Sequence, residues 1–269
     1  MKIERPNSKG VIAKISTILL LTFAFISCSK ENISFDGNEI LTKIETYNPS
    51  TQTTTALEYK YDNFGKLIEI VSSGNPSSDK QTFLYDANGN LISNTLSNNL
   101  SVNLYKYDFV VDSKGRIIKA TGTSFLSNLT IANHTYTYDI QGRLIIDSVF
   151  NQSGSIHSYI NFTYDNNNNV IEYQQFVNHG TSIIKSSTMV IEYDSKRSPY
   201  FRIGQTLYTS LGGSVSYFYL SKNNPIKATL NNTVITPGGN FIYQYYPNSL
   251  LRTSTANVAN SIVFTFYYN

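Results

Sequence analysis

The stretch Glu58-Tyr59-Lys60-Tyr61-Asp62-Asn63-Phe64-Gly65-Lys66-Leu67-Ile68 decides the fold of this chain, because its pattern returns at regular intervals. It joins an aromatic-x-Tyr pair to an Asp, a Gly three residues later and an apolar pair. Related stretches begin near residues 82, 111, 136, 162 and 191, and the position of Tyr61 recurs after 24, 26, 27, 26 and 29 residues. Self-similarity at such a period is typical of repeat architectures.

Each part of the repeat has a physical role in a β-hairpin. Side chains alternate across a strand, so an aromatic-x-aromatic pair places two rings on one face. Asp opens a turn by accepting backbone N–H groups, and Gly supplies the positive φ that closes it, commonly with a bulge. The pattern predicts an all-β protein, an antiparallel meander of hairpins in one long, curled and twisted sheet. The residues that carry the motif are Tyr61, Asp62, Gly65, Tyr85, Asp86, Gly89, Asp112, Gly115, Tyr138, Asp139, Gly142, Tyr164, Asp165, Tyr193, Asp194 and Pro199.

These repeats resemble the YD repeats of RHS and teneurin-like proteins, whose hairpins join edge to edge. A closer resemblance is to exported Bacteroidota lipoproteins of unknown function that are built from YD-like repeats. Those proteins carry a late Tyr-Asp-x-Lys-x-Asn-Pro-aromatic element, which here reads Tyr193 to Tyr200 with Ser198 in place of the Asn. The resemblance covers roughly residues 40–269 and implies a fold and an envelope location, but almost no function.

The region after residue 200 keeps aromatic stretches but loses the Asp-x-x-Gly turns. We expect further strands there, joined by longer loops, at residues 217–219, 243–245 and 264–267. No stretch resembles a linker between domains, so residues 39–269 are predicted to form one β domain.

The first 28 residues predict export and lipidation. Residues 1–27 read as a signal peptide, with a basic start, an apolar stretch from Ile15 to Ile26 that is too short to span a bilayer, and a small Ser27. Phe25-Ile26-Ser27-Cys28 resembles a lipobox, which implies that Cys28 carries a diacylglycerol and begins the mature protein, with residues 28–38 as a tether. The alternative is a plain secretory signal followed by a buried Cys. Lipidation implies that the protein's partner is the outer membrane. The short charged stretch Ser29-Lys30-Glu31-Asn32 resembles the surface-export signals of Bacteroidota lipoproteins, which implies exposure on the cell surface.

The charge of the chain argues against nucleic acid as a partner. The net charge of +3 comes from residues 1–27, which hold four basic residues and one acidic residue. The rest of the chain has 17 of each, and nucleic-acid binding normally needs a basic patch.

Candidate chemical sites are few. The loop that begins at Asp86 lacks the glycine and acidic positions of a calcium loop, and the three histidines have no zinc-site spacing. We therefore expect no metal, no cofactor and no catalytic residue, although groups that meet only in three dimensions stay open. Ser148, in Asp147-Ser148-Val149, is a candidate for O-glycosylation. The paired aromatic rings of the repeats are interpreted as packing that stacks across neighbouring hairpins, and alternatively as a platform for sugars.

Three functions remain open. The first is a non-catalytic surface module that binds a glycan or an envelope protein. The second is an envelope scaffold whose edge strands, the terminal Val263–Tyr267 among them, pair with a partner. The third is a hydrolase with an unrecognised site.

Overall fold

A computed structural model describes residues 39–74, 79–210, 217–231, 233–234, 241–256 and 261–269. The chain divides into two compact units, residues 1–34 and 35–269, and every described residue lies in the second. Cys28, the predicted signal peptide and the predicted tether therefore lie outside the described residues. Within the described part of the chain, no helix is long and apolar enough to cross a membrane.

The described residues form one antiparallel sheet of 17 strands and two short helical segments, α1 and η1. The elements are β1 (Leu41–Asn48), β2 (Thr53–Tyr61), β3 (Leu67–Ser73), β4 (Lys80–Tyr85), β5 (Leu91–Ser97), β6 (Asn103–Val111), β7 (Ile117–Ser124), β8 (Thr130–Tyr138), β9 (Leu144–Phe150), β10 (Ile156–Tyr164), β11 (Val170–Asn178), β12 (Ile183–Arg197), α1 (Gly204–Ser210), η1 (Tyr217–Leu220), β13 (Asn223–Leu230), β14 (Thr233–Val234), β15 (Phe241–Tyr245), β16 (Leu251–Ala256) and β17 (Val263–Tyr268).

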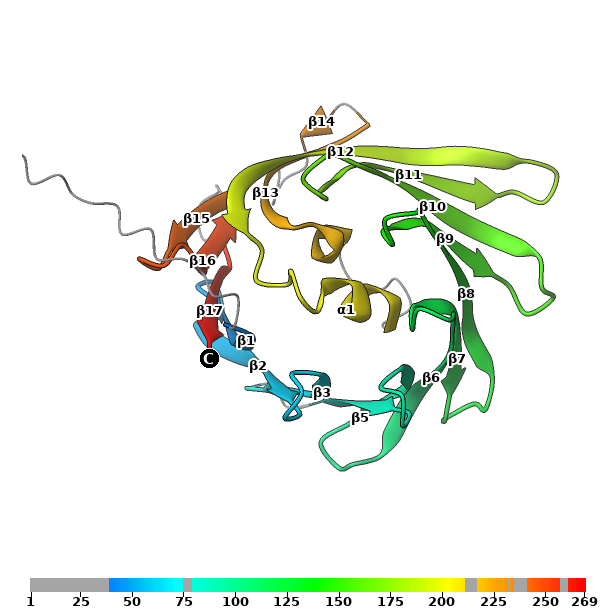
Figure 1. Cartoon of the computed structure of the whole chain (residues 1–269), viewed down its shortest axis with the longest axis horizontal. Helices are drawn as coiled ribbons and strands as arrows, with labels where there is room; N and C mark the ends of the chain where they lie inside the picture. Colours follow the sequence, from blue (N-terminus) through cyan, green and yellow to red (C-terminus); the bar gives the residue numbers. More distant parts are fainter. Residues whose placement is uncertain (1–38, 75–78, 211–216, 232, 235–240, 257–260) are drawn as a thin grey trace, which may run out of the picture. The chain divides into compact units, whose positions relative to one another are not determined.

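Each strand from β1 to β13 pairs with the next one along the chain, as a meander requires. β15 pairs with β16 and β16 with β17, and β17 returns to pair with β1. Figure 1 shows the resulting sheet curling around α1. The predicted all-β meander in one curled sheet is confirmed. β17 is not an edge strand, however, because β1 and β16 cover its two sides.

The repeats build the core of this sheet. The first aromatic residue of a motif points inward and is buried, as Tyr59, Phe83 and Phe162 show, each with about 5–6% of its surface exposed. The register shifts directly before the motif tyrosine, which pairs with the first residue of the return strand, as Tyr138 pairs with Leu144. That first residue is also buried, and Leu144 is fully so. Full burial of such a side chain contributes about 1.5–3 kcal/mol to folding.

The prediction of a strand at Tyr217–Tyr219 is wrong, because these residues lie in the 3₁₀ helix η1. The preceding segment also contains α1, which no sequence pattern predicted. Both segments face the inner side of the sheet, where a helical turn satisfies its own backbone groups without a strand partner. The Leu207 N–H, for example, donates to the Ile203 carbonyl at 2.8 Å. Gly204 makes this packing possible, since a Cβ there would overlap the Tyr219 carbonyl oxygen.

Candidate binding site

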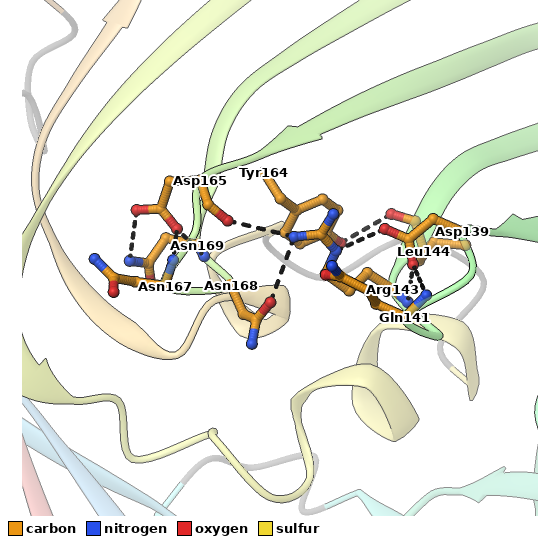
Figure 2. Close-up of polar contacts among 9 residues, drawn as sticks. All are labelled: Asp139, Gln141, Arg143, Leu144, Tyr164, Asp165, Asn167, Asn168 and Asn169. Carbon is orange, nitrogen blue, oxygen red and sulfur yellow. Dashed lines mark hydrogen bonds and ion pairs between the residues drawn. The ribbon is translucent and has the colours of Figure 1, made fainter.

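The Asp of each repeat closes its own hairpin. In the turn after β8, Oδ1 of Asp139 accepts the N–H groups of Gln141 and Arg143, both at 2.9 Å, and Gly142 has a φ of 84° (Figure 2). The fifth copy has Asn168 at the Gly position, with a φ of 65°. The same carboxylate geometry recurs at Asp62, Asp86, Asp112 and Asp165.

The tyrosine of each repeat joins its hairpin to the preceding one. The Tyr164 hydroxyl donates to the Leu144 carbonyl at 2.8 Å, and burial raises the pKa of this phenol well above its usual range. Equivalent bonds of 2.6–2.8 Å run from Tyr61 to Leu41, Tyr85 to Leu67, Tyr138 to Ile117 and Tyr193 to Val170. Val111 stands in the tyrosine position of the third copy and has no hydroxyl to donate.

The residue four positions after the Asp links one turn to the next. Arg143 donates from Nε to Oδ2 of Asp139 at 2.6 Å and stacks on the Tyr164 ring, 4.8 Å from its centre (Figure 2). Although partial burial raises the pKa of Asp139, the N–H and guanidinium of Arg143 bring that pKa below its ordinary value. Arg116 repeats the arrangement between Asp112 and Tyr138. The polar groups of the motif therefore stabilise the turns and the contacts between neighbouring hairpins.

The prediction that the paired aromatic rings stack on one another across hairpins is wrong. Among the described residues, no ring-to-ring contact joins two motif tyrosines, because a cation or an amide from the intervening turn lies between successive hairpins. Lys66, Arg116 and Arg143 lie over the rings of Tyr85, Tyr138 and Tyr164. The alternative of a sugar platform on these rings gains no support, since the rings face inward.

Ser148 lies in β9, where it pairs with Thr135 and Tyr159 and is half-buried. Its glycosylation stays a prediction. The neighbouring Asp147 points inward and is only 1% exposed.

Asp147 is the centre of a buried polar network that holds α1 against the sheet. Its Oδ1 lies 2.8 Å from Nδ1 of His134, and its Oδ2 accepts the Tyr208 hydroxyl of α1 at 3.1 Å. The Tyr136 hydroxyl donates to the Thr209 carbonyl at 3.0 Å. Burial, together with the Asp147 charge, raises the pKa of both tyrosines well above the usual range. No group of three or more potential metal ligands occurs among the described residues.

The final motif copy departs from the others and borders a cavity. Asp194 accepts the Lys196 N–H as in a normal turn, at 2.9 Å, but also the distant Asn224 N–H at 3.1 Å. Its Oδ2 accepts the Tyr245 hydroxyl of β15. Pro199 lies five residues further on and lines the cavity itself.

This aromatic cavity has a volume of about 220 Å³. Seven of its thirteen lining residues are aromatic, and none is charged. The rings come from four elements of the chain, namely Tyr200 before α1, Phe218 and Tyr219 of η1, Phe241 and Tyr243 of β15, and Phe264 and Phe266 of β17. Sequence reasoning singled out three of these stretches as aromatic strands, but it did not bring them together as a site.

Comparison with known proteins agrees with this fold. The family model described as Teneurin YD-shell matches residues 17–174, more than half of the chain. Two solved structures are similar, a porin-like protein from Bacteroides uniformis and another from Bacteroides vulgatus. The first has a TM-score of 0.56 at 12% identity, over 85% of this chain and 98% of that one. The second has a TM-score of 0.52 at 12% identity, over 86% and 99%.

At 12% identity these two structures show the fold alone. No curated protein matches the chain. The resemblance to YD repeats that the sequence predicts is confirmed by the family match. The chain belongs to the Teneurin YD-shell family.

Proposed function

We propose that this protein is a lipid-tethered, non-catalytic binding module of the cell envelope, which holds a small ligand inside its curled sheet. The aromatic cavity carries the proposal. Ligand sites are typically concave, mostly apolar and lined by aromatic residues, with a few polar groups at their border. The cavity has this character, and about 220 Å³ suits a small molecule and not a protein segment or a long glycan.

The other described features support a small ligand over the broader alternatives. The hydroxyls and carboxylates of the repeats are engaged in turns and hairpin contacts, so they offer little to a glycan. Pairing of a partner with the terminal strand would have to displace β1 or β16. A purely structural scaffold is the second candidate, and it is favoured by the buried network that fixes α1 inside the sheet.

The tether rests on the sequence of the first 38 residues. A basic start, a short apolar stretch and a lipobox-like Cys28 are what an outer-membrane lipoprotein requires. A diacylglycerol supplies the two chains that stable membrane attachment needs. The proposal includes exposure on the cell surface, which is supported by the charged Lys30-Glu31 pair close to Cys28.

Native mass spectrometry of the full-length protein, gently extracted from membranes of the native host, tests the binding function. We expect a stoichiometric small-molecule adduct that is absent from the cavity variant Phe241→Ala and present in Phe150→Ala, a half-buried β9 residue that does not line the cavity. A wild-type protein free of any adduct, together with glycan arrays that detect no binding, would favour the scaffold.

Metabolic labelling with an alkyne fatty acid tests the tether separately. The wild-type chain should take up label and sediment with membranes, whereas Cys28→Ser should do neither. Equal labelling of the two proteins would contradict lipidation at Cys28.

A further inference from the structure

We infer that the aromatic cavity selects an uncharged, apolar ring compound of one or two fused rings, and that it rejects sugars and ionised ligands. This inference rests on the proposed function, because it names the class of ligand for the same site. It is drawn from the state of the polar groups in the cavity wall, from the packing of the rings and from the volume.

The polar side chains that line the cavity already have partners within the protein. The Tyr243 hydroxyl donates to the Pro225 carbonyl and is bonded to Ser254, and the hydroxyls of Tyr200 and Tyr219 are bonded to each other. The Asn224 side-chain amide, in a residue only 2% exposed, donates to Oδ2 of Asp194 at 3.4 Å and to the Lys196 carbonyl at 3.3 Å. The remaining polar side chain, Ser198, accepts the Tyr200 N–H at 3.2 Å.

This arrangement determines which ligands can enter. A sugar would lose the water around several hydroxyls and find few partners in exchange. Each sugar hydroxyl that is buried without a hydrogen-bond partner weakens binding. A charged ligand would be penalised more strongly, because no lining residue carries an opposite charge. An apolar compound has neither cost, and the transfer of its apolar surface out of water favours binding.

The rings in the wall favour an aromatic or flat ligand. Phe218 and Phe241 meet edge to face, with centres 5.8 Å apart and planes at 87°. Such a wall presents both ring faces and ring edges, the two surfaces that a further aromatic ring contacts favourably. Each well-placed ring pair stabilises the complex beyond the effect of simple burial.

The volume of the cavity limits the size of the ligand. An apolar cavity of roughly 150 Å³ in another protein stays dry and binds benzene. The present cavity is larger, at about 220 Å³, and so accommodates one ring with substituents or two fused rings. Phe264 is 38% exposed and lines the cavity, so it marks the side nearest to solvent.

Because the sequence contains no Trp, a single introduced Trp is a specific fluorescence reporter. Phe264→Trp places a single indole at the cavity, and Tyr267→Trp places one on the same strand, β17, where the native hydroxyl instead donates to half-buried Glu45. Both proteins are titrated with toluene and with tetralin, which do not absorb at the excitation wavelength of 295 nm that isolates tryptophan. Benzoate and methyl β-glucopyranoside are the charged and the polar ring probes. Saturation-transfer NMR with the same four compounds on the unmodified full-length protein makes the test independent of the substitution.

We expect toluene and tetralin to change the Phe264→Trp fluorescence saturably and to leave Tyr267→Trp unchanged. Benzoate and the glucoside should bind at least tenfold more weakly. Phe241→Ala in the Phe264→Trp protein should weaken toluene binding at least fivefold, whereas Phe150→Ala should not change it. Equal or tighter binding of the glucoside or of benzoate overturns the inference and leaves the proposed binding function standing. No saturable response to any of the four compounds, in fluorescence or in NMR, overturns both.

Discussion

In the repeats, from β2 to β12, the tyrosine hydroxyls bond to carbonyl groups of the preceding hairpin, and cationic or amide side chains lie between successive rings. In the region after residue 198, aromatic residues from four elements instead surround a cavity of about 220 Å³. The same residue types thus form a closely contacting, hydrogen-bonded sheet in one region and surround an unfilled space in the other. In the repeats, the polar and aromatic groups contact one another, whereas the candidate site lies where the repeat pattern is lost.

The largest difference between the two regions should appear on truncation of their apolar side chains. Leu144 is fully buried among the repeats, so Leu144→Ala should lower the free energy of unfolding by about 2–5 kcal/mol. Phe241 is half-buried beside an existing cavity, so Phe241→Ala should cost only about 1–2 kcal/mol, less than a truncation in a filled core. Urea unfolding followed by circular dichroism measures both. Equal losses would remove the distinction between a filled and an unfilled region.

Substitutions at the positive-φ position of the turns should have different effects in different repeats. Gly142 has a φ of 84° and Asn168, at the same motif position, has 65°. A Cβ at Gly142 would meet no atom closer than 3.8 Å, so Gly142→Ala should cost about 1–2 kcal/mol through backbone strain alone. Asn168→Gly should change stability by less than about 0.5 kcal/mol, because Asn tolerates this conformation. Thermal unfolding tests the pair, and a Gly142→Ala protein as stable as wild type would contradict the role of the turn.

Removal of one tyrosine hydroxyl should have a smaller effect. Tyr164→Phe loses the 2.8 Å bond to the Leu144 carbonyl and should destabilise the protein by about 1 kcal/mol. The matched control is Tyr267→Phe, which loses an exposed bond to Glu45 and should cost almost nothing. In the opposite direction, Val111→Tyr restores the missing motif tyrosine and should add about 0.5 kcal/mol. A loss in Tyr267→Phe as large as that in Tyr164→Phe would show that the hairpin contact has no special weight.

The smallest effect is a pH dependence in the turns. The Arg116 side chain, with backbone N–H groups, holds the pKa of Asp112 below its ordinary value. A carboxyl whose pKa is lower in the folded protein stabilises it above the unfolded value of about 3.9, and this contribution is lost as the pH falls through the folded pKa. The melting temperature of Asp112→Asn should therefore lie below that of wild type at pH 6, and the gap should narrow below about pH 4. A gap that stays constant from pH 7 to pH 2 would contradict an ionic role for Asp112.

The repeat hairpins could be predicted from the sequence because their information is local. The interval from Tyr138 to Leu144 contains the strand end, the turn acceptor and the positive-φ residue, so a short window specifies the hairpin. Copies at regular spacing then specify a meander, since each hairpin has only its neighbours to pair with.

The position of α1 inside the sheet and the aromatic cavity could not be predicted in this way, because their contacts join residues that are distant in the sequence. Asp147 meets Tyr208 across 61 residues, and neither residue belongs to the motif. Tyr217–Tyr219 alternates like a strand, yet it forms a 3₁₀ turn because it lies inside the sheet, where a strand would have no partner. The cavity depends on a volume that several elements fail to fill, which no local pattern records.

The pairing of β1 with β17 has a consequence for how the protein is made. Leu41 of β1 pairs with Tyr268 of β17, so one side of β1 stays uncovered until β17 has been made and has paired with it. Contacts of such long sequence separation slow folding, and an uncovered strand edge invites association with other chains. Until β17 pairs with it, this side of β1 is therefore open to association with other chains, and deletion of β17 (Val263–Tyr268) would leave it uncovered in the folded protein.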